Sequence, residues 1–182
     1  MPARHLSTLL ATIVLLTVAT GGQAPPGRPN IVLLIMDDLG YGDLGSYGAP
    51  DAKTSNIDRL AREGVRFTDF YANAANCSPT RAGLMTGRYQ QRVGIESPLA
   101  VVNEQRALMP SPTSLPRLLK NAGYATGLIG KWHLGDKPAA YPTRHGFDEF
   151  WGFLRGGIDY YAHDFPTAPG GSGAASRQPD LF

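Results

Sequence analysis

The feature that most constrains the fold is an apolar run, residues 30–36 (NIVLLIM), that stops at two adjacent acidic residues, Asp37 and Asp38. A short run of this kind, β-branched in part, is typical of a strand buried on both faces in a parallel sheet. We therefore predict a strand over residues 30–36, with both carboxylates at its carboxyl end.

Later segments alternate between helical and strand patterns, and a glycine follows each helical segment. Glycine is common just past the end of a helix. The predicted helices lie around residues 57–61, 79–86 and 113–122, and the predicted strands cover residues 65–71 and 124–130. Because strands alternate with helices, the pattern predicts an α/β fold with a mostly parallel sheet flanked by helices on both faces.

Length and charge narrow the possible classes of protein. A chain of 182 residues is long enough to bury one hydrophobic core. The net charge of +2 gives no electrostatic reason to expect nucleic acid as a partner. Residues 169–179 are rich in Gly, Ala and Ser, and we predict a surface loop or linker there.

The first 24 residues have the layout of a cleaved signal peptide. Arg4 and His5 give a cationic start, an apolar run covers residues 9–20, and small residues follow at 22–24. The apolar run is shorter than the roughly 20 residues that span a bilayer. We therefore predict a secreted or periplasmic protein without a stable membrane anchor, with the folded domain over residues 25–182.

Cys77 is the only cysteine, so it cannot form an internal disulfide. A lone cysteine is usually a small buried hydrophobe, but the neighbours of Cys77 indicate another role. The predicted helix begins beside it, and free N–H groups at a helix N-terminus favour an anion. Arg81, four residues on, adds a guanidinium suited to an oxyanion. These residue types predict a nucleophile beside a site for a tetrahedral anion.

Two further groups of polar residues follow predicted strands. Asp37 and Asp38 follow one strand, and Lys131 and His133 follow another. Ligands of open parallel sheets bind outside the carboxyl ends of the strands. We therefore expect these groups and Cys77 to converge on one pocket.

Four motifs resemble those of the sulfatase family, which belongs to the alkaline phosphatase-like superfamily. They are CSPTRAGLMTGR at 77–88, GYATGLIGKWHL at 123–134, the segment 30–48, and NIDRLAREGVRFTDFY at 56–71. The resemblance covers about residues 29–163, and the stretch around His145 is similar to the arylsulfatase B-like part of the family. It implies an arylsulfatase-type hydrolase that acts on a sulfated small molecule or carbohydrate.

The resemblance also implies that a maturation enzyme oxidises Cys77 to formylglycine. The hydrated aldehyde offers two hydroxyl groups. One attacks sulfur and releases the alcohol, and the other expels sulfate by restoring the aldehyde.

Roles for the other site residues follow from the same resemblance. Asp37 and Asp38, with the modified Cys77, would hold Ca²⁺, or alternatively Mg²⁺, since both metals take oxygen ligands. Lys131 and His133 would bind the sulfate group, and His133 would also assist proton transfer. His163 is a candidate substrate contact, against the alternative of a loop histidine.

Several expectations concern the rest of the chain. Trp132, Trp151, Phe147 and Phe150 are predicted to be core residues. Thr80 stands where the family most often has Ser, but keeps the hydroxyl. Family members are several hundred residues long, so we interpret the chain as an N-terminal fragment, with further metal and sulfate ligands expected beyond Phe182. We expect it to be poorly folded and nearly inactive alone.

Two other functions stay open. Formylglycine-dependent phosphonate or phosphodiester hydrolases share the cysteine motif and the fold. A truncated, noncatalytic protein that keeps only the anion pocket is the third hypothesis.

Overall fold

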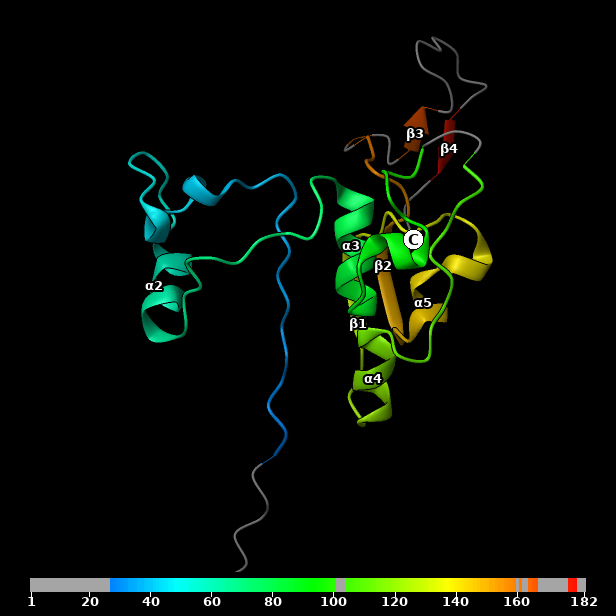
Figure 1. Cartoon of the computed structure of the whole chain (residues 1–182), viewed down its shortest axis with the longest axis horizontal. Coiled ribbons are helices and arrows are strands. Elements are labelled where there is room, and N and C mark those ends of the chain that lie inside the picture. Colours follow the sequence, from blue (N-terminus) through cyan, green and yellow to red (C-terminus); the bar gives the residue numbers. More distant parts are fainter. Residues whose placement is uncertain (1–26, 101–103, 160, 162–163, 167–176, 180–182) are drawn as a thin grey trace, which may run out of the picture. The chain divides into compact units, whose positions relative to one another are not determined.

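The computed structural model describes residues 27–100, 104–159, 161, 164–166 and 177–179 (Figure 1). The chain divides into two units, Met1–Leu39 and Gly40–Phe182, and each is described by itself. The predicted signal peptide, residues 1–24, lies outside the described residues.

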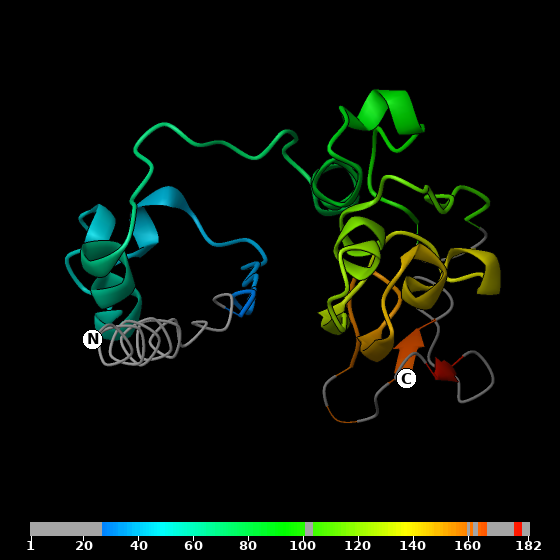
Figure 2. The same cartoon turned by 90° about the horizontal axis from the view of Figure 1, so that it is seen from below.

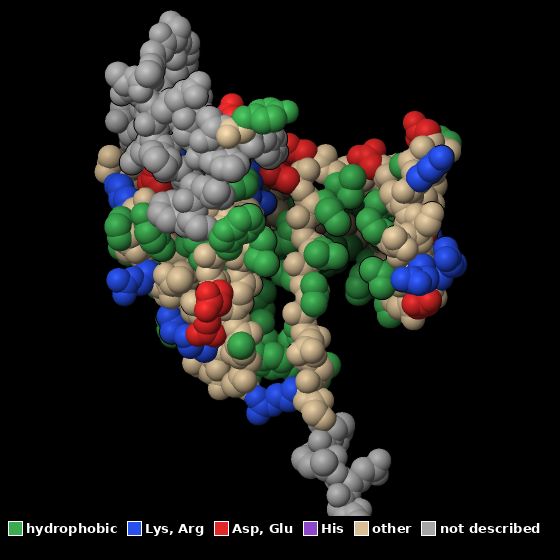
Figure 3. All heavy atoms as spheres, turned by 180° about the vertical axis from the view of Figure 1, so that it is seen from behind, with side chains coloured by type: hydrophobic (Ala, Val, Ile, Leu, Met, Phe, Trp, Pro, Cys, Tyr) green, Lys and Arg blue, Asp and Glu red, His purple; other side chains and the backbone are tan. Residues whose placement is uncertain are grey.

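The strand predicted over residues 30–36 is wrong, because these residues form no regular secondary structure. The side chains of residues 31–36 are between 43% and 80% exposed. Figure 3 shows hydrophobic side chains along the extended segment that continues from the grey N-terminal residues. A parallel strand exists only through hydrogen bonds to its neighbours, and no described strand pairs with this run.

The larger unit begins with two short 3₁₀ helices and one α-helix: η1 (Tyr41–Asp43), η2 (Gly45–Tyr47) and α2 (Ser55–Glu63). Asp58 of α2 accepts hydrogen bonds from Ser46 N at 2.7 Å and from Thr54 Oγ1 at 3.0 Å, which tie the helix to η2. The helix ends at Gly64, so the helix predicted around residues 57–61 is confirmed.

The strand predicted over residues 65–71 is wrong. The described backbone there is irregular, and Phe67 is 62% exposed. The carbonyl oxygen of Phe67 accepts a hydrogen bond from Tyr47 Oη at 2.7 Å. The hydroxyl group of Tyr47 thus occupies a main-chain carbonyl group that would accept a hydrogen bond from a neighbouring strand in a sheet.

Helix α3 (Cys77–Thr86) confirms the short helix predicted after Cys77. Pro79 lies in its first turn, where its missing N–H costs nothing. Gly87 ends the helix with φ +65°, and its N–H donates to Gly83 O at 2.8 Å. A third 3₁₀ helix, η3 (Gln90–Val93), packs against α3.

The parallel sheet consists of β1 (Gly127–Lys131) and β2 (Glu149–Phe153), in a register that pairs Lys131 with Phe153. Helix α4 (Leu115–Asn121) precedes β1, and η4 (Pro138–Ala140) and α5 (Pro142–His145) lie between the strands. Figure 1 shows α5 beside β2, and Figure 2 looks nearly along the axis of α3, which packs against α4. The predicted α/β class with a parallel sheet is confirmed, as are the helix within residues 113–122 and a strand that overlaps residues 124–130.

The core lies where α3 meets the segment that follows β1. Trp132 is 2% exposed and its Nε1 donates to Ala140 O at 3.0 Å, so its prediction as a core residue is confirmed. Phe147 and Phe150 are half-buried and pack against the core. Trp151 is 63% exposed, so its prediction is wrong. It pairs in register with Ile129, which is 80% exposed, on a strand face that the described residues leave uncovered.

Two short strands near the C-terminus, β3 (Asp164–Pro166) and β4 (Arg177–Pro179), pair antiparallel. The loop predicted over residues 169–179 is therefore wrong at 177–179, because β3 supplies backbone partners for these residues. The rest of that predicted loop lies outside the described residues. Within the part of the chain that the structure describes, no helix is long and apolar enough to cross a membrane.

Candidate functional site

Cys77 is the first residue of α3, as the sequence predicts, and its side chain is half-buried. Ser78, Pro79 and Ala82 on the same helix are buried, so packing holds this helix end in place. The amide groups of the first turn have no acceptor within the helix itself. The helix end therefore offers donors where an anion or a polar nucleophile can be stabilised.

Arg81 and Lys131 are brought together. Arg81 Nη1 donates a hydrogen bond to the main-chain carbonyl oxygen of Lys131 at 2.6 Å, and Arg81 as a residue is half-buried. Lys131 is the last residue of β1. The cysteine motif and the second motif, 50 residues apart in sequence, thus meet at the carboxyl end of a parallel strand.

His133 lies two residues beyond β1 and is 7% exposed. Its backbone has φ +58°, a left-handed conformation that a non-glycine residue adopts only at a cost of roughly 1–2 kcal/mol. His133 N donates to Leu154 O at 2.9 Å, and ring atom Nε2 contacts Leu99 O at 3.1 Å. Contacts from two other segments therefore fix this histidine.

The structure adds residues that the sequence alone did not single out. Ser78 is fully buried, and its Oγ accepts a hydrogen bond from Leu99 N at 3.0 Å. Gly156 lies against the ring of His133, since a Cβ added there would lie 2.7 Å from Cε1. The position of Ser78 beside Cys77 is the one signal that could have marked it. Leu99 acts through its main chain and leaves no such signal.

A second buried histidine, His145, packs behind this segment. Its ring lies edge-on to Trp132 with 4.9 Å between ring centroids, and the residue is 1% exposed. Burial lowers the pKa of His145 to about 4, and the charge of Arg117 acts in the same direction. His145 is therefore neutral at physiological pH and serves the core next to the site.

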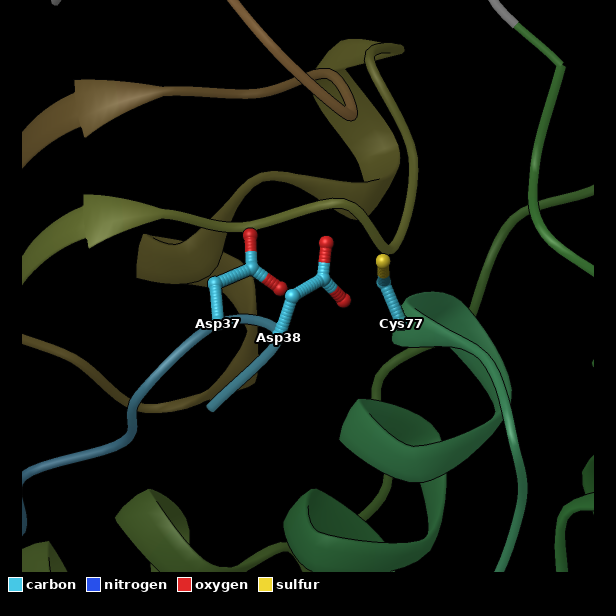
Figure 4. A group of neighbouring side chains, drawn as sticks. All are labelled: Asp37, Asp38 and Cys77. Carbon is cyan, nitrogen blue, oxygen red and sulfur yellow. The ribbon is translucent and has the colours of Figure 1, made fainter. Parts of the chain in front are cut away.

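Asp37 and Asp38 belong to the Met1–Leu39 unit, where both are exposed. Figure 4 shows their carboxylates on the same side of the chain segment. Asp38 has φ +60°, a conformation that Asp tolerates better than most residues. Figure 4 also labels Cys77, which belongs to the larger unit and begins α3. His163 lies outside the described residues.

Comparison with known proteins identifies the family. The Sulfatase family model matches residues 29–177. N-acetylgalactosamine-6-sulfatase of Sus scrofa is 46% identical over 151 residues, which cover 77% of this chain and 28% of that protein. Arylsulfatase A of Bos taurus is 45% identical, over 82% of this chain and 29% of that protein.

Solved structures agree. The crystal structure of PsFucS1 sulfatase from Pseudoalteromonas sp. matches with a TM-score of 0.61, at 35% identity over 87% of this chain and 31% of that one. The chain thus spans less than a third of the length of these relatives. The family match and the identities together establish that the chain belongs to the sulfatase family.

Proposed function

We propose that this protein hydrolyses sulfate esters, with Cys77 converted to formylglycine as the nucleophile. The observation that carries the proposal is the hydrogen bond from Arg81 to Lys131, which joins the two motifs of the family at one helix end. Membership of the family supports the reaction class.

Cys77 is suited to become the reacting group because of where it lies. It begins α3 and is half-buried, so a maturation enzyme has to act on the chain before or while this segment packs. The modified residue supplies a hydrated aldehyde whose two hydroxyl groups can serve in turn for attack on sulfur and for release of sulfate.

Asp37, Asp38 and the modified Cys77 would hold the metal ion. Two carboxylates are hard oxygen donors, which fit Ca²⁺ or Mg²⁺. The sulfur of unmodified Cys77 is a soft donor that fits neither ion, and it stands in for the oxygen of the hydrated aldehyde. When bound, the metal would polarise an oxygen of the sulfate group.

Three side chains would act on the sulfate group itself. Lys131 would place its ammonium on the nonbridging oxygens, where negative charge develops. Arg81 would hold the end of β1 that carries Lys131, and its guanidinium would add positive charge beside α3. His133 would exchange a proton with the nucleophile during sulfate release.

Sulfated carbohydrates are the proposed substrate class, in keeping with the name of the relative N-acetylgalactosamine-6-sulfatase. His163 is proposed as a contact to the leaving group. We further propose that residues 1–24 direct export to a secreted or periplasmic location and that residues 25–182 form the N-terminal part of the catalytic domain.

The test is turnover of an aryl sulfate by the protein as its native host makes it, rather than by these 182 residues alone, after conversion by a formylglycine-generating enzyme and beside a Cys77→Ala variant. We expect turnover of the aryl sulfate by the converted protein and none by the variant. A phosphodiester with the same aryl leaving group separates the two enzyme hypotheses. Preference for the phosphodiester, or equal rates for protein and variant, would contradict the proposal.

A further inference from the structure

The peptide groups of Leu99 connect the residue after Cys77 with His133. Leu99 N donates to Ser78 Oγ at 3.0 Å, and Leu99 O lies 3.1 Å from His133 Nε2. Ser78 is fully buried, Leu99 is 5% exposed and His133 is 7% exposed. Water therefore competes little for these hydrogen bonds, and their geometry is set by the protein.

The direction of the hydrogen bond at His133 determines which ring nitrogen carries a proton. A carbonyl oxygen only accepts, so Nε2 must be the donor to Leu99 O. A neutral imidazole has one N–H and one lone pair. The lone pair of neutral His133 is therefore on Nδ1, and Nδ1 is the nitrogen that can take up a further proton.

Two further contacts hold the ring in this orientation. The left-handed backbone of His133, with φ +58°, persists only where surrounding contacts outweigh its strain. Gly156 leaves the space that the ring needs, because a Cβ there would lie 2.7 Å from Cε1 and 2.8 Å from Nε2. Even one added methyl group at residue 156 would displace the ring or its Nε2 contact.

We propose that Ser78 is a positioning residue that fixes the tautomer of His133 through the peptide groups of Leu99. Ser78 orients the amide of Leu99, and the Leu99 carbonyl then holds the proton of His133 on Nε2. The role in catalysis rests on the proposed function. In that reaction, Nε2 would keep its proton on Leu99 O, so Nδ1 would be the ring nitrogen left to take up a proton.

The test is the tautomer of His133 in Ser78→Ala, read from long-range ¹H–¹⁵N spectra of protein labelled with ¹⁵N-histidine at a pH where the ring is neutral. A His133→Gln variant assigns the signal among the 4 histidines. We expect the Nε2–H form in the unaltered protein and a mixture of both tautomers in Ser78→Ala. Gly156→Ala should perturb the same signal from the other side of the ring.

Ser114→Ala is the matched control, because Ser114 is also fully buried and its side chain also makes a single described hydrogen bond, from Oγ to His145 O at 2.8 Å. We expect it to keep the Nε2–H form of His133. An Nδ1–H form in the unaltered protein, or an unchanged Nε2–H form in both Ser78→Ala and Gly156→Ala, would overturn the proposal.

Measuring aryl sulfate turnover beside the tautomer distinguishes a failure of the positioning role from a failure of the proposed function. Aryl sulfate turnover with an unchanged tautomer in Ser78→Ala counts against the positioning role alone. The expected tautomer change in a protein without turnover supports the structural part and counts against the proposed function alone. If both hold, turnover of Ser78→Ala should fall at least about tenfold, since proton transfer by a positioned side chain contributes roughly 100-fold or more.

Discussion

Arg81 Nη1 donates a hydrogen bond to the main-chain oxygen of Lys131 at 2.6 Å. The bond joins the first turns of α3 to the last residue of β1, so it couples the position of Cys77 to that of Lys131. A guanidinium presents several donors in a rigid plane, a geometry that suits both carbonyl oxygens and oxyanions.

Arg81→Lys should therefore weaken both the structure and the reaction. Lysine has a single ammonium that cannot serve the Lys131 carbonyl and an anion with the same geometry. We expect the free energy of unfolding to fall by about 1–2 kcal/mol and turnover to fall at least about tenfold. Chemical denaturation and aryl sulfate assays measure the two effects. Arg88→Lys, on an exposed residue of the same segment, is the control and should change neither.

Gly146→Ala should destabilise the fold strongly. Gly146 has φ +116°, and a Cβ there would lie 2.7 Å from Arg117 N and 2.8 Å from Arg117 Cα, where backbone atoms cannot move aside cheaply. We expect a loss of more than about 2 kcal/mol in thermal or urea unfolding. Gly94→Ala is the matched control, with φ +72° and open space around it. It should lose about 1 kcal/mol, and equal losses at both positions would show that the contact with Arg117 is unimportant.

His145 should make the fold less stable in acid. Burial lowers the pKa of His145 from 6.5 to about 4, so between these values the unfolded chain binds a proton that the folded chain does not. Stability from neutral His145 is complete above pH 6.5 and is lost as the pH falls toward 4, by up to about 3 kcal/mol.

Urea unfolding across this pH window measures the effect, and His145→Gln removes it. The variant should be less stable near neutral pH, because it loses the contact with Trp132, but its stability should change less with pH. Parallel pH profiles for both proteins would contradict the assignment.

Asp38→Asn should remove the stabilisation that a metal ion gives. An ion that binds only the folded state raises stability by an amount that grows with its concentration. We expect Ca²⁺ to raise the unfolding temperature of the converted protein and a chelator to abolish turnover. The variant should lose both responses, whereas Asp51→Asn, at an exposed position, should keep them. An unaltered Ca²⁺ response in Asp38→Asn would exclude this carboxylate as a ligand.

The sequence predicted the elements that local signals define. Helices α3 and α4 lie where spacing and a following glycine placed them, because caps and periodicity act within a few residues. The strands predicted over residues 30–36 and 65–71 did not form, because a strand depends on partners that a local pattern cannot supply. The prediction that Trp151 is buried failed for a related reason, since its burial depends on what covers the outer face of β2.

For the candidate site, the sequence pointed to side chains but not to main-chain contacts. Motifs singled out Cys77, Arg81, Lys131 and His133 as candidates by residue type, because the proposed chemistry of these residues lies in their side chains. The link through Leu99 was not predictable, because any residue has a main-chain N–H and C=O and only the fold determines what they contact.

The conversion of Cys77 to formylglycine is tested most directly by the mass of the tryptic peptide that contains it, residues 67–81, from protein purified after co-expression with the maturation enzyme or from its native host. We expect a mass about 18 Da below that of the thiol peptide, as oxidation of the cysteine to the aldehyde requires, in protein that turns over an aryl sulfate. An unmodified thiol at Cys77 in protein with the same turnover would contradict it.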